Sequence, residues 1–548
     1  MNNENLNKRF NWLLMMLLVS VFQVITAIPV ITKEGGFNFI IFGIFIAYIF
    51  IEWMYFFVAD VFCGQNNFEL ETIGFLFSGI GLTVSASVYD DYALKQMLAI
   101  VLGLFVFITL IIILRRTDIV MKLRMPVAFA AVGLLALNLV LAEYNNGALN
   151  WITVAGFSVQ PSEIVKLAFI FVGAASLDKL QSAKSITKYV IFSIGCVGAL
   201  FLMRDFGTAL IFFFTFVIIA FMRSGDMRTI VLVCVAAALG AIMIIYFRPT
   251  VAARFSTYRH IWEQMNEAGM QQTRVLIYSV SGGLFGLGIG NGNLKHIFAS
   301  TTDLVFGILC EEWGMIVALL VVMAYVFILL YAIKVARNTR SAFYAIAACA
   351  AAGLMLFQTA LNVFGVTDIL PLTGVTLPFI SRGGSSMICS WGLLAFIKAA
   401  DIRTYPKLSK TILPEHPLYP PDIRIGRASP IVSRNNRPAP QGTRRRTVPN
   451  VPVQTPDEPT RTPRRQAPSA PAPAPRQQTP RQQQPQRRPA PQRPTPQKTA
   501  PQRPVSQRNH AGTARQPSQT RQAPAQRPAP QRQAPPRGRT PNDRRTPR

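Results

Sequence analysis

The sequence predicts an all-α polytopic membrane protein with a large outer loop and a long disordered C-terminal tail. Two observations support this fold class. The chain has 548 residues, 51% of which are apolar, although its formal net charge is +29. Residues 405–548 hold 29 of the 55 Lys and Arg, 5 of the 26 acidic residues and 33 of the 39 prolines, and so carry a charge of +24. Such a stretch cannot bury a core, and the first 404 residues are correspondingly more apolar.

Apolar runs of about 20 residues, the length that crosses a bilayer, divide the first 404 residues. We predict twelve spans, at 11–32, 37–59, 72–88, 96–114, 125–142, 163–178, 188–203, 206–222, 229–247, 304–333, 341–365 and 385–400. An inner N-terminus places most Lys and Arg in inner loops, as membrane proteins prefer. Both chain ends are therefore expected in the cytoplasm, and the first run is expected to be an anchor, not a cleaved signal peptide.

Three polar segments, 143–163, 248–303 and 366–384, are then expected at the outer surface. The first leads into the stretch Gln160-Pro161-Ser162-Glu163-Ile164-Val165-Lys166. Proline suits the first turn of a helix, and Glu163 and Lys166 lie on the same side of that helix. A capped helix start with a local ion pair explains these residues. A carboxylate and an ammonium at membrane depth are nevertheless costly and tend to mark function.

A second pair of charges, Arg204 and Asp205, lies between two apolar runs. A short outer turn with a solvated ion pair and a role in substrate binding are both compatible with this position. The sequence leaves the two interpretations open.

The long outer loop, 248–302, contains Arg254, Gln271 and the glycine run Gly282–Gly292. Glycines at this spacing allow either close approach of the backbone to a ligand or tight turns. Asp303 follows the loop and is expected at the membrane boundary. Thr302 or Asp303 is expected to cap the next helix, and Asp303 is also a candidate general base.

The third outer segment, 371–386, includes Ser381-Arg382-Gly383-Gly384-Ser385. Backbone N–H groups in such a turn before a helix form an anion-binding concavity, and Arg382 adds a charge that suits phosphate. A re-entrant connection would use the same glycines and prolines. Taken together, Pro161, Asp303 and Gly383 predict one outer-face site for a substrate that carries phosphate. The scattered Cys and His residues predict no metal site.

Five blocks, in order, make the sequence similar to the SEDS family (shape, elongation, division and sporulation), whose members include FtsW and RodA. They are Gln160–Lys166, Asp205–Ala209, Gly282–Gly292, Thr302–Gly314 and Pro371–Ser386. The resemblance implies a ten-helix core at 72–404, so residues 1–71 add two helices ahead of it, while composition predicts the disordered basic tail at 405–548. Glu52, inside an added helix, is assigned no role.

The resemblance also implies a peptidoglycan glycosyltransferase that polymerises lipid II (undecaprenyl-pyrophosphate disaccharide-pentapeptide) at the outer face of the bacterial cell membrane during division or elongation. Asp303 matches the family's essential outer-loop aspartate, and we expect it to be the general base. Glu163 and Lys166 match a functionally important carboxylate and lysine. Arg382 departs from the family, since many members have tyrosine there. The expected substrate-binding residues are Glu163, Lys166, Arg204, Arg254, Gln271, Ser381, Arg382, Gly383, Gly384 and Ser385.

The expected partners are a class B penicillin-binding protein transpeptidase and other division or elongation proteins. No cofactor is predicted; a divalent cation on the pyrophosphate stays open, and the sequence shows no ligand set for it. The tail is expected to bind anionic lipid headgroups, at roughly 1 kcal/mol per nearby base. A solvated extension without a defined partner stays open, and the lack of interleaved aromatic residues argues against a nucleic-acid-binding domain. Two other function classes stay open, a flippase or transporter of a lipid-linked precursor and a non-catalytic division scaffold. Clustering of the motifs at one face favours the enzyme.

Overall fold

The long apolar runs of the sequence form helices, because in a lipid environment the backbone must satisfy its own hydrogen bonds. The computed structural model describes residues 3–32, 36–61, 67–145, 148–154, 157–177, 183–228, 255–267, 269–339 and 341–401, with 231, 233–235, 238, 242, 246 and 252. All of these fall within the unit Met1–Asn435, and the second unit, Asn436–Arg548, lies outside the described residues. The predicted tail, 405–548, therefore lies outside them too.

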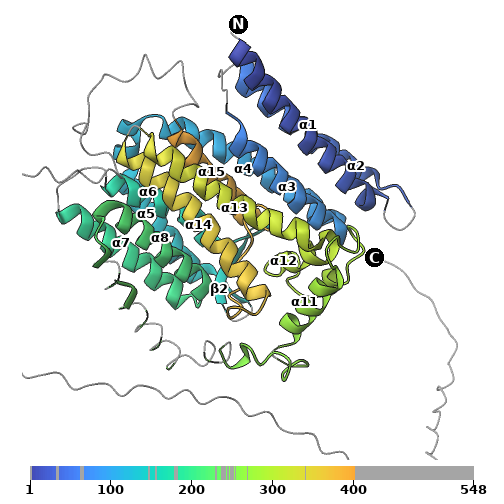
Figure 1. The fold of residues 1–548 in the computed structure, drawn as a ribbon. Helices are drawn as coiled ribbons and strands as arrows, with labels where there is room; N and C mark the ends of the chain where they lie inside the picture. Colours follow the sequence, from blue (N-terminus) through green and yellow to red (C-terminus); the bar gives the residue numbers. More distant parts are fainter. Residues whose placement is uncertain are drawn as a thin grey trace, which may run out of the picture. The chain divides into compact units, whose positions relative to one another are not determined.

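The described helices confirm the all-α polytopic prediction (Figure 1). Eight of those described are long and apolar enough to cross a membrane, and two more apolar helices are shorter. Every predicted span except 229–247 coincides with helix, and 229–247 lies largely outside the described residues. The helices are α1 (Asn3–Ile31), α2 (Phe39–Val61), α3 (Glu69–Val88), α4 (Asp90–Leu114), α5 (Thr117–Leu141), α6 (Pro161–Leu177), α7 (Ala183–Leu202), α8 (Phe206–Ser224), α11 (Met270–Ser281), η2 (Leu294–His296), α12 (Val305–Ile308), the π-helix η3 (Leu309–Trp313), α13 (Gly314–Arg337), α14 (Ala342–Val366) and α15 (Gly384–Ala400).

A small antiparallel sheet, which the sequence analysis does not predict, connects α5 to α6. Its strands are β1 (Glu143–Asn145), β2 (Ala148–Val154) and β3 (Phe157–Val159), paired in the order β1-β2-β3. β2 contacts both α5 and α6, and β3 contacts α15. The sheet therefore brings Asn150 and Trp151 close to the start of α6.

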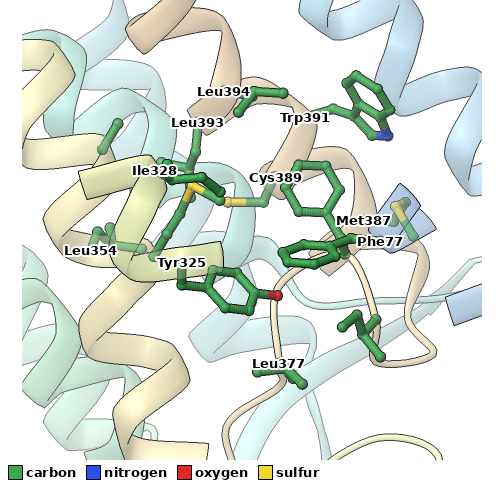
Figure 2. Packing of buried hydrophobic residues seen from close by; sticks show 14 of the residues in the cluster. Phe77, Tyr325, Ile328, Leu354, Leu377, Met387, Cys389, Trp391, Leu393 and Leu394 are labelled. Atoms are coloured by element: carbon green, nitrogen blue, oxygen red, sulfur yellow. The ribbon is translucent and has the colours of Figure 1, made fainter. Parts of the chain in front are cut away.

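Close helix packing holds α15 inside the bundle, where it lies along α4. A Cβ added at Gly103 of α4 would lie 2.7 Å from Trp391 Cδ1, so only glycine fits at this crossing. Figure 2 shows Trp391, Phe77 and Tyr325 around the start of α15, with the Phe77 and Tyr325 ring centroids 4.8 Å apart. Small residues at such contacts let membrane helices approach closely.

A buried ion pair joins the other end of α15 to the start of α3. Lys398 Nζ lies 2.8 Å from Glu71 Oε1, and both side chains are fully buried. Asp401 accepts hydrogen bonds from Asn67 (2.8 Å) and from Tyr331 (2.6 Å). These contacts fix α3, α13 and α15 to one another at the end opposite Val88 and Gly384.

The first two helices pack side by side on this bundle, with α1 against α3 and α2 against α4 (Figure 1). Glu52 of α2 is fully buried, and Gln23 of α1 is 1% exposed. The two polar side chains lie together between α1 and α2, where the Gln23 amide is the neighbour of the Glu52 carboxyl.

Candidate functional site

A cavity of about 870 Å³ lies where several helices end or begin. Its walls come from the α3–α4 turn, β2, β3, the first turns of α6, α8 and α15, and the segments 295–303 and 373–376. Eight predicted site residues line it: Glu163, Lys166, Arg204, Asp303, Arg382, Gly383, Gly384 and Ser385. Segments far apart in the sequence thus meet at one place, as predicted.

Lys166 is the most deeply buried cation of the cavity wall, with 1% of its side chain exposed. Its Nζ lies 2.8 Å from Glu163 Oε1 and 2.9 Å from Gln358 Oε1. Gln358 in turn donates to the carbonyl of Thr376 (2.8 Å), whose hydroxyl lies 2.8 Å from the hydroxyl of Ser386. The ion pair expected from the sequence is therefore present, and it belongs to a polar network that joins α6, α14 and α15.

Asp205 is buried and holds three elements together. Its Oδ1 accepts from the amide of Thr208 (3.1 Å) and so caps α8. Its Oδ2 accepts from the side-chain amides of Asn150 (3.1 Å) and Gln160 (3.0 Å). The solvated-pair interpretation is wrong for Asp205, because only 8% of the residue is exposed. Arg204, before it, is half-buried and lines the cavity.

Asp303 occupies the turn before α12 and lines the cavity. The predicted cap is wrong, since Leu304 is the N-cap and no side chain caps α12. Asn362 Nδ2 instead donates to the main-chain carbonyls of Asp303 (2.8 Å) and Val375 (2.7 Å). Gly374, at φ +69°, lies opposite, and a Cβ there would be 3.4 Å from Asp303 Oδ2. The carboxylate is thus placed in the cavity by contacts to its main chain.

Arg382 is fixed by contacts on two sides. Its amide and Nε donate to the carbonyl (2.8 Å) and hydroxyl (3.1 Å) of Thr301. Its guanidinium lies 3.9 Å from the ring centroid of Tyr92, a cation–π contact. The charge is therefore preorganised at the cavity wall.

The start of α15 beside Arg382 partly matches the predicted anion site. No side chain caps this helix, and Gly383, Gly384 and Ser385 line the cavity. The amide of Gly383, however, donates to Gln96 Oε1 (3.3 Å), and the Ser385 hydroxyl accepts from the amide of Gln160 (3.2 Å). The first-turn amides of α15 remain as donors for an anion.

Two of the predicted site residues that the structure describes, Ser381 and Gln271, do not line the cavity. Ser381 is 1% exposed; its hydroxyl donates to the carbonyl of Thr302 (2.5 Å) and accepts from the amide of Leu377 (2.8 Å). Gln271 lies in α11, away from the lining residues. Arg254 lies outside the described residues.

Sequence reasoning missed Lys95, Lys295 and His296, which also line the cavity. The sequence contains a signal for Lys95 and Lys295. Basic residues are disfavoured in outer loops, and both lysines nevertheless lie in loops assigned to the outer side. Five Lys or Arg and three Asp or Glu side chains line the described cavity, which therefore favours an anionic ligand. Among the described residues, no three His, Cys, Asp or Glu side chains gather to hold a metal ion.

One flank of the cavity is apolar and reaches the surface of the helix bundle. Leu98 and Leu102 of α4 and Ile164 of α6 line the cavity and are 45%, 46% and 41% exposed. Because α4 is a candidate membrane span, this flank faces the bilayer. The cavity therefore joins a cationic interior to a lipid-facing side.

The family model for FtsW, RodA and SpoVE (FTSW_RODA_SPOVE), described as "Cell cycle protein", matches residues 66–405. The chain belongs to this family. The match confirms the resemblance to FtsW and RodA, and α1 and α2 precede the matched residues.

Curated relatives of this FtsW/RodA/SpoVE-family chain carry activity names. It is 27% identical over 352 residues to the probable peptidoglycan glycosyltransferase FtsW of Bacillus subtilis, covering 61% of this chain and 86% of that protein. It is 26% identical over 321 residues to the peptidoglycan glycosyltransferase RodA of Mycobacterium leprae, covering 56% and 69%. Stage V sporulation protein E of B. subtilis is 30% identical over 249 residues, covering 44% and 68%.

A solved structure supports the fold of this chain. The structure "Structural coordination of polymerization and crosslinking by a peptidoglycan synthase complex" contains a chain that matches with a TM-score of 0.52 and 24% identity. The match covers 60% of this chain and 96% of that chain.

Four of the five sequence blocks border the cavity, whereas the glycine run 282–292 contributes no lining residue.

Proposed function

We propose that this protein is a peptidoglycan glycosyltransferase that polymerises lipid II into glycan strands at the outer face of the cytoplasmic membrane. The observation that carries the proposal is that Asp303 lines a cationic cavity with a lipid-facing apolar flank. A lipid-linked sugar pyrophosphate has the matching parts: an apolar chain, a dianionic linker and a sugar. Membership of the family and the names of its relatives support the same activity.

In the proposed reaction, a hydroxyl oxygen of the acceptor sugar attacks the anomeric carbon of the donor. The new carbon–oxygen bond forms as the bond from that carbon to the pyrophosphate breaks. Asp303 takes the hydroxyl proton, and the lipid pyrophosphate leaves with the bonding electrons. A well-placed general base contributes about 10²–10⁴-fold to such a rate.

The leaving pyrophosphate is stabilised by the fixed charge of Arg382 and by the first-turn amides of α15, with Arg204 and Lys295 as further cations. Lys295 Nζ also donates to the Gly290 carbonyl (2.5 Å), whereas Lys95 is paired with Asp91 (2.7 Å). Preorganised donors stabilise developing charge without reorganisation cost. Lys166 and Glu163 lie deeper and already pair with each other. The pair holds the start of α6, and its carboxylate is neutralised by Lys166, so Glu163 is not a second base.

The polyprenyl chain of the donor lies along the flank formed by Leu98, Leu102 and Ile164, which keeps it in the bilayer. This arrangement requires the cavity to open on the outer side, with both chain ends in the cytoplasm, as the distribution of Lys and Arg predicts. A class B penicillin-binding protein transpeptidase is the proposed partner. The similar solved chain comes from a complex described as coordinating polymerisation and crosslinking.

The test is polymerisation of lipid II by purified protein, with and without the transpeptidase, beside an Asp303→Asn variant. We expect long glycan strands from the wild type and a rate lower by about 10²–10⁴-fold for the variant, with an unchanged melting temperature. Equal rates would remove Asp303 as the base. A folded wild type that moves lipid II across vesicles without joining it would favour a flippase, and cell growth that tolerates Asp303→Asn would favour a scaffold.

A further inference from the structure

The main chain of the glycine run forms the hydrogen bonds that a break in the helix after Asp303 leaves unmade. The π-helix η3 ends at Gly314, where φ is +86°, and the regular hydrogen bonds between η3 and α13 are interrupted. The main-chain carbonyls of Glu311 and Glu312 accept instead from the amides of Leu287 (2.9 Å) and Gly288 (3.1 Å).

On the other side of the break, the amides of Met315 and Ile316 donate to the carbonyls of Gly283 (3.1 Å) and Leu284 (3.3 Å). All four groups are thus satisfied inside the protein, which membrane depth requires. Of the two roles that the sequence left open for this run, the described contacts support tight turns against protein.

The side chains of the π-helix add a second set of bonds to the same loop. Glu311 is fully buried, and its two oxygens accept from the amides of Asn293 (2.7 Å) and Leu294 (2.9 Å). Glu312 accepts from the amide of Gly290 (2.8 Å). A Cβ at Gly292 would lie 2.7 Å from Glu311 Oε2, so glycine is required for this approach.

The two residues bonded to Glu311, Asn293 and Leu294, come directly before Lys295 and His296 in the sequence, and the latter two line the cavity. Leu294, which directly precedes Lys295, is fully buried and packs on Gly307, where a Cβ would lie 2.7 Å from Leu294 Cδ2. The far end of this wall segment is held independently. Thr301, Thr302 and Asp303 are bonded through their main-chain carbonyls to Arg382, Ser381 and Asn362.

We propose that Glu311 is a positioning residue that fixes the main chain at Asn293 and Leu294 and thereby holds Lys295 and His296 against the cavity. The inference rests on the proposed function for its kinetic consequence, though not for its structural one. Lys295 lines the cavity while its Nζ donates to the Gly290 carbonyl (2.5 Å), so it adds a fixed positive charge to the wall. Since that charge attracts a pyrophosphate, loss of the anchor raises KM for lipid II. Since Asp303 keeps its contact to Asn362, kcat changes less than KM.

The structural arm of the test is hydrogen–deuterium exchange on the full-length protein in detergent, followed at the amides of Asn293 and Leu294. Exchange there is expected to be about 10- to 100-fold faster in Glu311→Ala than in the wild type, as for loss of a hydrogen bond to a charged acceptor. Glu311→Gln, which keeps one acceptor oxygen, should lie between the two. It also serves as the readout if Glu311→Ala does not fold.

Two control variants separate anchoring from general destabilisation. Glu71→Gln alters an equally buried carboxylate at the other end of the helices, and Glu267→Ala removes an exposed one from the same long loop. Neither should change exchange at Asn293 and Leu294. Unchanged exchange in Glu311→Ala, or equally fast exchange in Glu71→Gln, would overturn the anchor.

The kinetic arm measures polymerisation of lipid II by the same variants. We expect KM to rise by about tenfold or more for Glu311→Ala and by less for Glu311→Gln, with a smaller change in kcat. Faster exchange with unchanged KM would reject the positioning role. A wild type that makes no polymer would reject the proposed function, and the exchange arm would still decide the anchor.

Discussion

Lys166 Nζ lies between Glu163 Oε1 and Gln358 Oε1, at 2.8 and 2.9 Å, with almost no exposure to solvent. Lys166→Met should therefore destabilise the protein by about 3–5 kcal/mol, because it leaves the Glu163 carboxylate buried without its cation. Thermal unfolding in detergent measures the loss.

The double variant Glu163→Gln/Lys166→Met is the matched control for this pair. It should recover part of the stability that Lys166→Met loses, since no buried charge remains unpaired. Simple additivity of the two single changes would show that the pair is not coupled.

Arg382→Lys keeps the charge at the cavity wall but loses the Nε bond to Thr301 and the planar stack on Tyr92. We expect the KM for lipid II to rise by about tenfold, because an ammonium does not reproduce the fixed geometry of a guanidinium. Steady-state polymerisation assays measure this change. Tyr92→Phe keeps the ring face and should match the wild type, so a large loss there would point to the Tyr92 hydroxyl and away from the stack.

Glu52→Leu should raise the melting temperature, in contrast to most changes at fully buried positions. The Glu52 carboxyl is fully buried with the Gln23 amide as its neighbour, and burying a polar group that is poorly hydrogen-bonded costs about 1–3 kcal/mol. The same change at Glu71, which pairs with Lys398, should lower it. A destabilised Glu52→Leu protein would indicate that this carboxyl has a bonding role.

Removal of residues 405–548 should leave polymerisation in detergent unchanged, because the described residues that line the cavity all precede 389. The intact protein should bind anionic vesicles more tightly than the truncated one, and added salt should reduce the difference. Sedimentation with vesicles measures binding, and a truncated protein without activity would contradict the prediction.

The helices were predictable because each long apolar run has one stable form in lipid, and Pro161 begins α6 as its fixed backbone angle suggests. The clustering of Glu163, Asp303 and Arg382 was also predictable, since each lies at or next to the outer end of a predicted span. The direction in which each side chain points was not. Ser381 turns inward to bond Thr302 and Leu377, while its neighbour Arg382 turns to the cavity.

Contacts between distant segments could not be predicted from the sequence for a similar reason. The bonds from Glu311 to Asn293 and Leu294 depend on a break in a helix that hydropathy alone does not reveal. A solvated pair stayed open for Asp205 because its amide partners, Asn150 and Gln160, come from a sheet and a helix start about 50 residues earlier. Local patterns carry no information about such partners.

The apolar flank of Leu98, Leu102 and Ile164 is the side from which we expect the lipid-linked donor to enter the cavity, directly from the bilayer. If the lipid anchor stays in the bilayer throughout, the protein samples a two-dimensional pool, and turnover follows the number of donor molecules per area of membrane. Dilution of the donor with inert lipid should then slow the reaction even when the amount of donor per volume of solution is constant. Glycan strands, by contrast, are polar and belong to the aqueous side, so the supply of donor depends on the membrane while the growth of the product does not.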